Sequence, residues 1–204
     1  MSTEYVERST TIIKQIEGLE LVPYAMRLLA AGEPVALARL AAAAGRSLDE
    51  VEAALGEQTS AERDTEGRLV GLGLTLRPTP HRYLIDDRRV FAWCASDALI
   101  FPVVLGRPGI IESTCGLTGQ AIRVELTPDG VERVDPQGAV VSAIRPVGRL
   151  EDVRSAICRH GQFFASPEAA ARWAAEHPGV EIRPVEDAFA LDRKVARRVG
   201  WEAR

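Results

Sequence analysis

The apolar positions near the start of the chain recur with a helical period. In the segment 21–31 they lie three or four residues apart, on one face of an α-helix; they are Leu21, Val22, Tyr24, Ala25, Leu28 and Leu29. Gly32 can end this helix and Pro34 can open the next one, because glycine is favoured just after a helix and proline in its first turn. The pattern therefore predicts one helix over 21–31 and a second shortly after it.

The second predicted helix is alanine-rich and spans residues 35–44. After it, Ser47 and Glu50 have the spacing of a capping box, in which the two side chains satisfy backbone N–H groups at the start of a helix. Residues 45–47 would then join two short helices, an arrangement typical of a helix-turn-helix. The first sixty residues are therefore predicted to be helical.

Beyond residue 60 the pattern changes to that of β-strands. Segments 68–76 and 81–85 could pair as a hairpin across the loop Pro78-Thr79-Pro80, like the wing of a winged helix. We therefore predict a winged-helix-like helical module over residues 1–80 and a second domain over residues 81–204.

The second domain alternates between helical and strand patterns. Helices are predicted over 90–105, reaching or kinking at Pro102, over 150–157, from Ser166 to before Pro178, and over 186–199. Strands are predicted over 109–114, 120–126, 131–144 with a break at 136–138, 160–165 and 180–184. The fold class is α+β, with a mixed core of mostly antiparallel strands.

Composition limits the class of protein. The 204 residues are 46% hydrophobic and 26% charged, which is typical of a globular chain and excludes wholesale disorder. The best apolar stretch, 98–105, is too short for a membrane span and contains Pro102. The first ten residues carry Glu4 and Glu7 and lack the apolar segment of a secretory signal. We therefore expect a cytoplasmic protein with no membrane partner.

The net charge of −4 is concentrated at the start of the chain. Residues 1–60 hold nine acidic and five basic residues, whereas residues 61–204 hold twenty of each. Binding to DNA requires basic groups that neutralise phosphates. We therefore expect no nucleic-acid partner, and we interpret the helical module as a scaffold or lid.

The cysteines are the main chemical candidates. There are three, and an odd number argues against a disulfide framework. Cys94 and Asp97 are three residues apart, so on a helix they would share a face and a proton could pass between them. An alternative stays open at this point, in which a buried cysteine merely lies near a solvated aspartate.

The other two cysteines have weaker patterns. His160 follows Cys158 closely, but adjacent positions point in different directions, so an ordinary polar histidine is the better interpretation. The turn 115–119 resembles half of a zinc knuckle, yet successive cysteines are 21 and 43 residues apart and no second pair completes it. Cys115 is therefore interpreted as a packing residue. Signatures of nucleotide-binding loops, zinc proteases and serine hydrolases are missing from the sequence.

Several short blocks of sequence are specific when they are taken together and in order. They are residues 73–79 (GLTLRPT), 86–89 (DDRR), 92–102 (AWCASDALIFP), 115–119 (CGLTG), and Cys158 ahead of 163–166 (FFAS). In this order the blocks resemble the organomercurial lyase (alkylmercury lyase) family. The resemblance runs from about residue 20 to about residue 190, nearly the whole chain.

The resemblance implies which residues act. In that family two cysteines and one aspartate cleave carbon–mercury bonds, and here they fall on Cys94, Asp97 and Cys158. A further cysteine, regarded as structural, falls on Cys115. Some members carry another cysteine directly after the position of Cys158, where this chain has Arg159. The three-residue set is intact, but an extra thiol that could assist product release is missing.

The implied reaction is protonolysis of the carbon–mercury bond. Thiolates are soft ligands that capture mercury in preference to carboxylates. Our hypothesis is that Cys94 binds the organomercurial first, and that Asp97 takes the proton of the second thiol and passes it to the leaving carbon. Free aspartate has a pKa near 3.9 and holds almost no proton at neutral pH, so it acts as a shuttle. Burial would favour its protonated form; the candidate walls of a dry pocket are Trp93, Phe163 and Phe164.

The resemblance also implies the partners. No cofactor is expected; Hg(II) stays on Cys94 and Cys158, with Asp97 as a further candidate ligand, until small external thiols release it. Mercuric reductase is the implied acceptor. Two other functions stay open: a mercury carrier or sensor, which needs thiols but no acid, and a thiol redox protein, for which a Cys-x-x-Cys motif is lacking.

Overall fold

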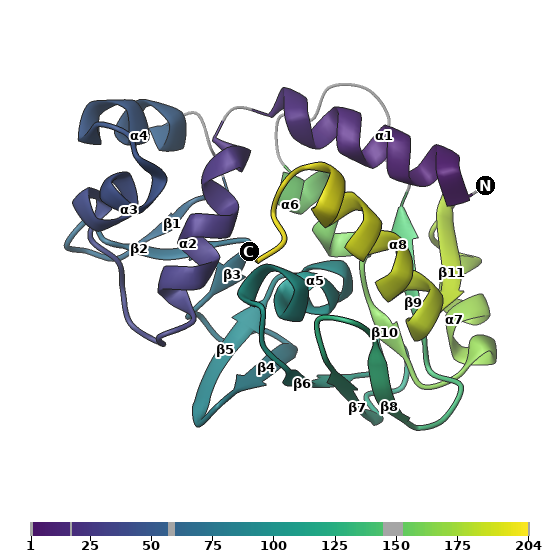
Figure 1. Cartoon of the computed structure of the whole chain (residues 1–204). Coiled ribbons are helices and arrows are strands. Elements are labelled where there is room, and N and C mark those ends of the chain that lie inside the picture. Colours follow the sequence, from purple (N-terminus) through teal and green to yellow (C-terminus); the bar gives the residue numbers. More distant parts are fainter. Residues whose placement is uncertain (1, 17, 57–59, 145–152, 204) are drawn as a thin grey trace.

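The computed structural model describes residues 2–16, 18–56, 60–144 and 153–203. In this part of the chain, two antiparallel sheets lie beside a group of helices (Figure 1). The larger sheet has eight strands in the order β1-β2-β3-β5-β4-β6-β7-β8, and the smaller has three in the order β10-β9-β11. The α+β class with mostly antiparallel strands is therefore confirmed.

The start of the chain is helical, as the sequence predicted. Its elements are α1 (Ser2–Gln15), the 3-10 helix η1 (Leu19–Leu21), α2 (Val22–Leu29), α3 (Leu37–Ala44) and α4 (Leu48–Gly56). The capping box at α4 forms: the Ser47 N–H donates to Glu50 Oε2 at 2.8 Å and the Glu50 N–H donates to Ser47 Oγ at 3.3 Å. None of the described helices is long and apolar enough to cross a membrane.

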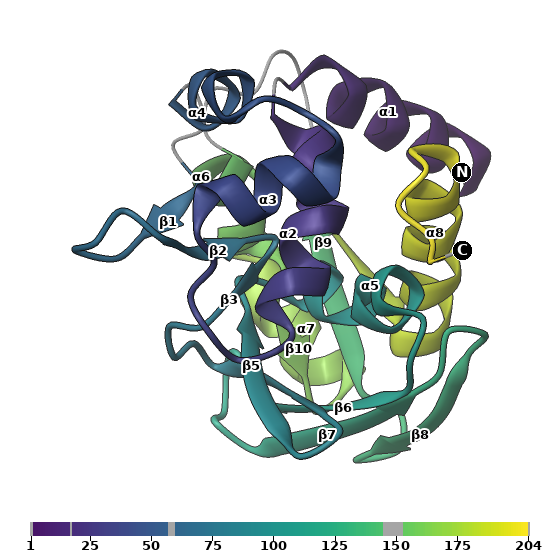
Figure 2. The same cartoon turned by 60° about the vertical axis from the view of Figure 1, so that its left-hand side comes forward.

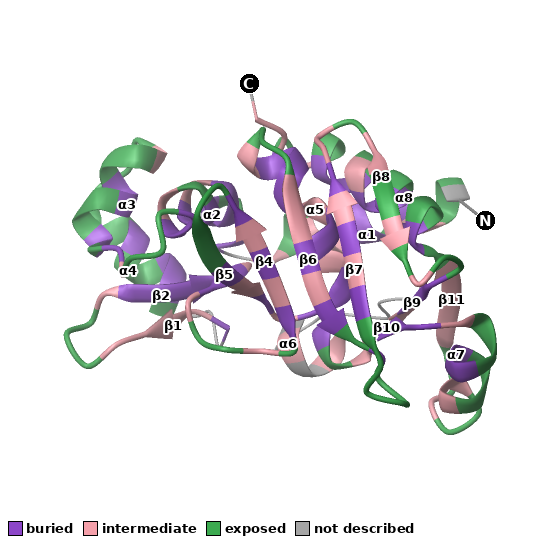
Figure 3. Cartoon of the chain, turned by 90° about the horizontal axis from the view of Figure 1, so that it is seen from below, coloured by how far each residue is buried: buried purple, intermediate pink, exposed green. Residues whose placement is uncertain are grey.

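The large sheet presents one buried face to the helices. Its strands are β1 (Glu62–Arg63), β2 (Leu69–Leu72), β3 (Leu74–Thr75), β4 (His81–Ile85), β5 (Arg88–Ala92), β6 (Gly109–Thr114), β7 (Ala121–Leu126) and β8 (Val131–Asp135). Burial alternates along β4 and β7, as Figure 3 shows from the outer side of the sheet. Such alternation is typical of an antiparallel sheet that packs on one side only.

Helix α5 (Ala95–Leu105) lies between the large sheet and α8 (Val185–Arg198), and α1 lies on the far side of α8 (Figures 1 and 2). The core lies between α5 and the sheet, where the fully buried Tyr83 and Phe101 rings meet edge to face at 5.0 Å. Because seven of the eleven residues of α5 are buried, this helix is fixed on all sides. Its N-terminus is therefore a rigid place for a functional group.

The small sheet carries the second half of the site. It consists of β9 (Val140–Ile144), β10 (Phe163–Phe164) and β11 (Val180–Pro184), with α6 (Val153–Ala156), the 3-10 helix η2 (Cys158–His160) and α7 (Pro167–Ala174) around it. Ser166 caps α7 by accepting the Ala169 N–H at 3.3 Å, which confirms the predicted helix start. The chain between β9 and β10 thus brings η2 to the edge of α5.

The predicted hairpin between segments 68–76 and 81–85 is wrong. Gly73 has a φ of 74°, and the turn at this residue splits the first segment into β2 and β3, which pair with each other. A side chain at Gly73 would meet Val22 Cγ1 at 2.9 Å, so the turn also lets α2 approach closely. Strand β3 continues the sheet to β5, and β4 pairs with β5 and β6. The strands predicted as a wing therefore belong to the large sheet.

The helix predicted over 90–105 begins too early. Val90 and Ala92 are buried in β5, where Val90 faces Tyr83 and Ala92 faces His81 on β4. A β-branched residue such as Val90 favours a strand when a partner strand is available. The helix begins at Ala95 and continues past Pro102 to Leu105.

Two elements near Cys158 are shorter in the described part of the chain than the sequence predicted. Of the strand predicted over 160–165, only Phe163–Phe164 is extended and paired, because residues up to His160 form η2. Of the helix predicted over 150–157, residues 150–152 lie outside the described part, and α6 covers Val153–Ala156.

Candidate active site

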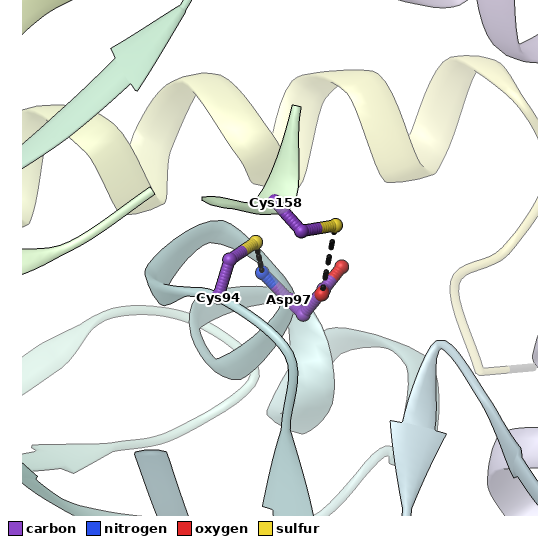
Figure 4. A group of neighbouring side chains, drawn as sticks. All are labelled: Cys94, Asp97 and Cys158. Carbon is purple, nitrogen blue, oxygen red and sulfur yellow. Dashed lines mark hydrogen bonds between the residues drawn. The ribbon is translucent and has the colours of Figure 1, made fainter. Parts of the chain in front are cut away.

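Three of the predicted site residues meet in one cluster. Cys94, Asp97 and Cys158 each place a ligand atom within 4.8 Å of the others, although 61 residues separate Asp97 from Cys158 (Figure 4). All three cysteines of the chain are free thiols. In zinc sites a metal–thiolate bond is about 2.3 Å, so two sulfurs on opposite sides of one ion would lie about 4.6 Å apart, which is within this limit. The cluster can therefore hold one soft metal between its two sulfurs.

Cys94 is the N-cap of α5. Its backbone is extended, with φ −149° and ψ 175°, and its Sγ accepts a hydrogen bond from the Asp97 N–H at 3.5 Å. An N-cap side chain satisfies one of the free N–H groups at the start of a helix, and negative charge is favoured there. The three-residue spacing from Cys94 to Asp97 is therefore the spacing of a cap and its N3 residue, and it holds both groups on one side of α5.

Cys158 reaches the cluster from η2. Its Sγ donates to Asp97 Oδ2 at 3.7 Å (Figure 4). The segment is held by the backbone: the Ala95 N–H donates to the Gly161 carbonyl at 2.9 Å. Ser142 on β9, which is fully buried, donates through Oγ to the His160 carbonyl at 2.6 Å. The position of the second thiol thus depends on hydrogen bonds from two separate elements.

Gly161 allows the two thiol segments to touch. A Cβ at this residue would lie 3.0 Å from Cys94 Cβ and 3.3 Å from Cys94 Sγ. Any larger residue would push the segments apart. Sequence reasoning missed both Gly161 and Ser142. A glycine that lets two segments approach closely cannot be told from any other turn glycine until the neighbouring segment is known.

The protonation states of the cluster follow from burial and mutual contact. Burial raises the pKa of Asp97 to about 6, although hydrogen bonds from the two cysteines lower it. The hydrogen bond to Cys158, together with burial, raises the pKa of Cys94 well above its ordinary value. For Cys158 the hydrogen bond to Cys94 lowers the pKa, but burial and the nearby Asp97 carboxylate outweigh it and raise the pKa. At neutral pH both thiols therefore keep their protons, and the carboxylate can receive one at small cost.

A cavity of about 140 Å³ opens onto the cluster and includes all three residues in its lining. Most of its other walls are apolar, among them Ile12, Ile16, Leu19, Ile100, Ile157 and Val195. The thiols of Cys94 and Cys158 belong to residues that are only 1% and 4% exposed. An apolar cavity of about 150 Å³ is large enough to bind benzene. The cavity therefore has room for a small alkyl or phenyl group beside the sulfurs.

Helix α1 forms one wall of this cavity, which sequence reasoning missed. The lining residues of α1 are Tyr5, Ser9, Ile12 and Ile13, and Ile16 follows directly after the helix. Their spacing of three and four residues was a visible signal of an amphipathic helix. What the helix covers could not be read from that spacing, because α8 and α5, its neighbours here, are far away in sequence.

The three aromatic residues expected as pocket walls do not line the cavity among the described residues. The Trp93 ring lies under the Arg154 guanidinium, whose carbon is 4.6 Å from the ring centroid. The ring centroids of Phe163 and His81 are 5.8 Å apart, and those of Phe164 and Trp173 are 5.2 Å apart. Isoleucine, leucine and valine side chains from helices and loops supply the apolar walls in their place.

The remaining candidates lie apart from the cluster. Burial alone would raise the pKa of Cys115, but hydrogen bonds from the Thr118 side chain and from the backbone N–H groups of Ala165, Leu117 and Thr118 lower it. His160 accepts the Arg159 Nε–H at 3.0 Å through Nε2. Within the described residues, neither Cys115 nor His160 joins the group of atoms that could hold a metal.

Comparison with known proteins agrees with the geometry. A family model described as alkylmercury lyase matches residues 74–197, and one described as the helix-turn-helix domain of alkylmercury lyase matches residues 19–73. A solved structure described as the mercury-bound form of MerB2 is 22% identical and superposes with a TM-score of 0.80, covering 97% of this chain and 99% of that one. This likeness shows that the two chains share a fold.

Curated relatives are similar over most of the chain. The alkylmercury lyase of Bacillus cereus is 42% identical over 205 residues, which cover 97% of this chain and 94% of the relative. The alkylmercury lyase of Staphylococcus epidermidis is 44% identical over 173 residues, covering 85% and 80%. That of Pseudomonas putida is 40% identical over 174 residues, covering 85% and 82%. The chain therefore belongs to the alkylmercury lyase family.

Proposed function

We propose that this chain cleaves the carbon–mercury bond of organomercurials by protonolysis, with Cys94, Asp97 and Cys158 as the reacting groups. The observation that carries the proposal is the cluster itself: two thiols and a carboxyl within 4.8 Å of one another, facing a small apolar cavity. Each group has a distinct task, and the geometry supplies all three tasks in one place.

The first step is capture of the organomercurial cation, R–Hg⁺, by one sulfur. We assign this step to Cys94, because its Sγ already accepts the Asp97 N–H at the N-terminus of α5. The Cys94 proton passes to the small external thiolate that carried R–Hg⁺ and is displaced from it, while the helix N-terminus stabilises the developing Cys94 thiolate. A mercury–sulfur bond forms, and the organic group remains bonded to mercury in the apolar cavity.

The second step brings the proton. Cys158 donates its S–H to Asp97 Oδ2 in the free protein, so the proton path is already formed. When the Cys158 sulfur bonds to mercury, its proton passes to Asp97, which then protonates the carbon. The carbon–mercury bond breaks, and its electron pair stays with carbon in the new C–H bond of the hydrocarbon. Hg(II) remains on the two sulfurs.

The third step is product release. Two sulfurs hold Hg(II) in a cluster whose cysteines are almost fully buried, so small external thiols must exchange for them. Mercuric reductase as the final acceptor stays a prediction. So do the cytoplasmic location, the absence of a nucleic-acid or membrane partner, and the division of the chain into a module over 1–80 and a catalytic core over 81–204.

The experiment is turnover of methylmercury or phenylmercury with excess dithiol, with methane or benzene measured by headspace gas chromatography. Cys94→Ser and Cys158→Ser should each abolish turnover, because a hydroxyl does not capture mercury. Asp97→Asn should still bind mercury but release hydrocarbon about 10²- to 10⁴-fold more slowly, since an amide cannot carry the proton. Bound mercury is measured by mass spectrometry.

The matched control is Cys115→Ser, whose thiol lies outside the cluster. It should keep turnover and lower the melting temperature, because the Cys115 sulfur accepts several hydrogen bonds in its turn. Turnover by either serine variant of the cluster would contradict the two-thiol scheme. Mercury binding by the wild-type chain without hydrocarbon would identify a carrier or sensor.

A further inference from the structure

A second polar group lines the cavity and has no role in the proposed chemistry. The Tyr5 hydroxyl of α1 donates to Asp192 Oδ1 of α8 at 3.1 Å, across 187 positions of sequence. Asp192 is 6% exposed, and both residues belong to the cavity lining. Burying a carboxyl costs free energy that an apolar residue would not incur. The pair therefore calls for an explanation other than packing.

The contacts of Tyr5 join three elements. Its ring lies under the Arg183 guanidinium of β11, whose carbon is 4.3 Å from the ring centroid, while its hydroxyl is bonded to α8. Around this point α1 is attached through a small apolar cluster, Val6 with Leu191 and Val195, which is separate from the main core. Ile13 and Ile16 pack against the main core as well, so the contacts of Tyr5 add a directional attachment to α8 beside these apolar ones.

The separation of α1 and α8 determines the width of the cavity. Helix α1 supplies Tyr5, Ser9, Ile12 and Ile13 to the lining, and α8 supplies Asp192, Val195 and Ala196. Figure 1 shows α1 and α8 side by side, and α8 also contacts α5, which contains Asp97 and has Cys94 as its N-cap. A change in the Tyr5–Asp192 contact therefore changes the space available beside the two thiols.

We propose that Tyr5 and Asp192 are specificity-determining residues, whose hydrogen bond holds α1 against α8 and so limits the organic group of the substrate to about the size of a single ring. This inference rests on the proposed function. With the bond in place, small groups lie in contact with the mostly apolar walls and with the pair. Without it, α1 can move outward, so larger groups fit and small ones lose contacts.

The test compares two substrates of different size. For the wild-type chain and each variant, kcat/KM is measured with methylmercury chloride and with 1-naphthylmercury chloride, under excess dithiol. Tyr5→Phe removes only the hydroxyl, and Asp192→Leu removes both acceptor oxygens at similar volume. Tyr5→Phe should raise the naphthyl-to-methyl ratio about fivefold, which corresponds to one hydrogen bond of about 1 kcal/mol. Asp192→Leu also removes the hydrogen bond from Ser96, so it should raise the ratio at least as much.

Conservative and distant variants test whether the ratio responds to loss of the Tyr5–Asp192 hydrogen bond or to any substitution of a tyrosine or an aspartate. Asp192→Asn keeps an oxygen that can accept the Tyr5 proton, so it should keep the wild-type ratio. Tyr24→Phe on α2 and Asp187→Asn on the exposed side of α8 should also leave the ratio unchanged. Melting temperatures show whether each variant is folded. If Asp192→Leu does not fold, the ratio measured for Tyr5→Phe alone tests the inference.

The outcomes are distinct. Wild-type turnover of methylmercury with an unchanged ratio in folded Tyr5→Phe would overturn the inference and leave the proposed function standing. Absence of wild-type turnover would overturn the proposed function and this inference together. A ratio that shifts equally in Asp192→Asn and Asp192→Leu would also overturn it, because charge and not the hydrogen bond would then control the cavity.

Discussion

Two carboxyl groups face the same cavity, the half-buried Asp97 and the buried Asp192, and they differ in their partners. Asp97 lies between two thiols, whereas Asp192 has Tyr5 and the Arg183 guanidinium nearby. Burial raises the pKa of Asp97 to about 6 and the pKa of Asp192 to about 7. Hydrogen bonds from Ser96 and Tyr5 lower the pKa of Asp192, whereas the negative charge of Asp97 raises it. An ordinary aspartate titrates near 3.8. The folded protein therefore holds protons on these groups to a higher pH than the unfolded chain does.

This difference predicts a pH-dependent stability. Between about pH 4 and about pH 7 the folded state binds more protons than the unfolded state, so the free energy of unfolding falls as pH rises, by at most about 1.4 kcal/mol per pH unit for each group. Asp192→Asn removes one of these groups. Urea unfolding across this range should show a smaller loss of stability in that variant than in the wild-type chain. The exposed Asp187→Asn should follow the wild type, and parallel curves for Asp192→Asn and wild type would contradict the assignment.

At the scale of the elements, the two helix starts with a capping serine were predicted correctly from local signals, whereas the predicted strand pairing was wrong. Caps and turns placed the helices: Ser47 with Glu50 begins α4, and Ser166 begins α7. The predicted pairing of 68–76 with 81–85 was wrong, because the sharp turn at Gly73 pairs β2 with β3, and β3 then pairs with β5. Capping involves residues three positions apart, whereas strand pairing depends on all the strands that are available.

The cap of α4 allows a direct measurement. Ser47→Ala removes the hydroxyl that accepts the Glu50 N–H, which should lower the free energy of unfolding by about 1 kcal/mol. Turnover should be unchanged, because neither residue lines the cavity. Chemical denaturation and the hydrocarbon assay measure the two effects separately. Thr65→Ala, in an exposed turn, serves as the control, and an equal loss of stability there would contradict the role of the cap.

For the molecule as a whole, the helix-turn-helix part and the part that holds the site share their framework. Strands β1, β2 and β3 lie in the same eight-stranded sheet as β4 to β8. Helix α2 contacts β2 and β3 and also α5, whose N-terminus carries Cys94. Figure 2 shows α2 and α5 on the same side of this sheet. A continuous set of packed elements therefore connects the two ends of the sheet.

This continuity predicts a single cooperative unfolding transition. If the two parts share one sheet and one core, neither should melt alone, and the calorimetric and van't Hoff enthalpies should agree. Differential scanning calorimetry, with thiols kept reduced, measures both. Two resolved transitions, or a van't Hoff enthalpy well below the calorimetric one, would show that the parts unfold independently.

The sequence by itself determined the features that depend on near neighbours. The helical start, the α+β class and the proximity of Cys94 to Asp97 all follow from spacings of a few residues, and the ordered blocks around them indicated the family. Tertiary structure alone decided the rest. Cys158 joins the cluster through a backbone hydrogen bond at Gly161 and the hydrogen bond that the Ser142 hydroxyl donates to His160, and α1 covers the cluster. These contacts connect distant segments, and the burial that shifts the pKa values arises only after those segments have packed together.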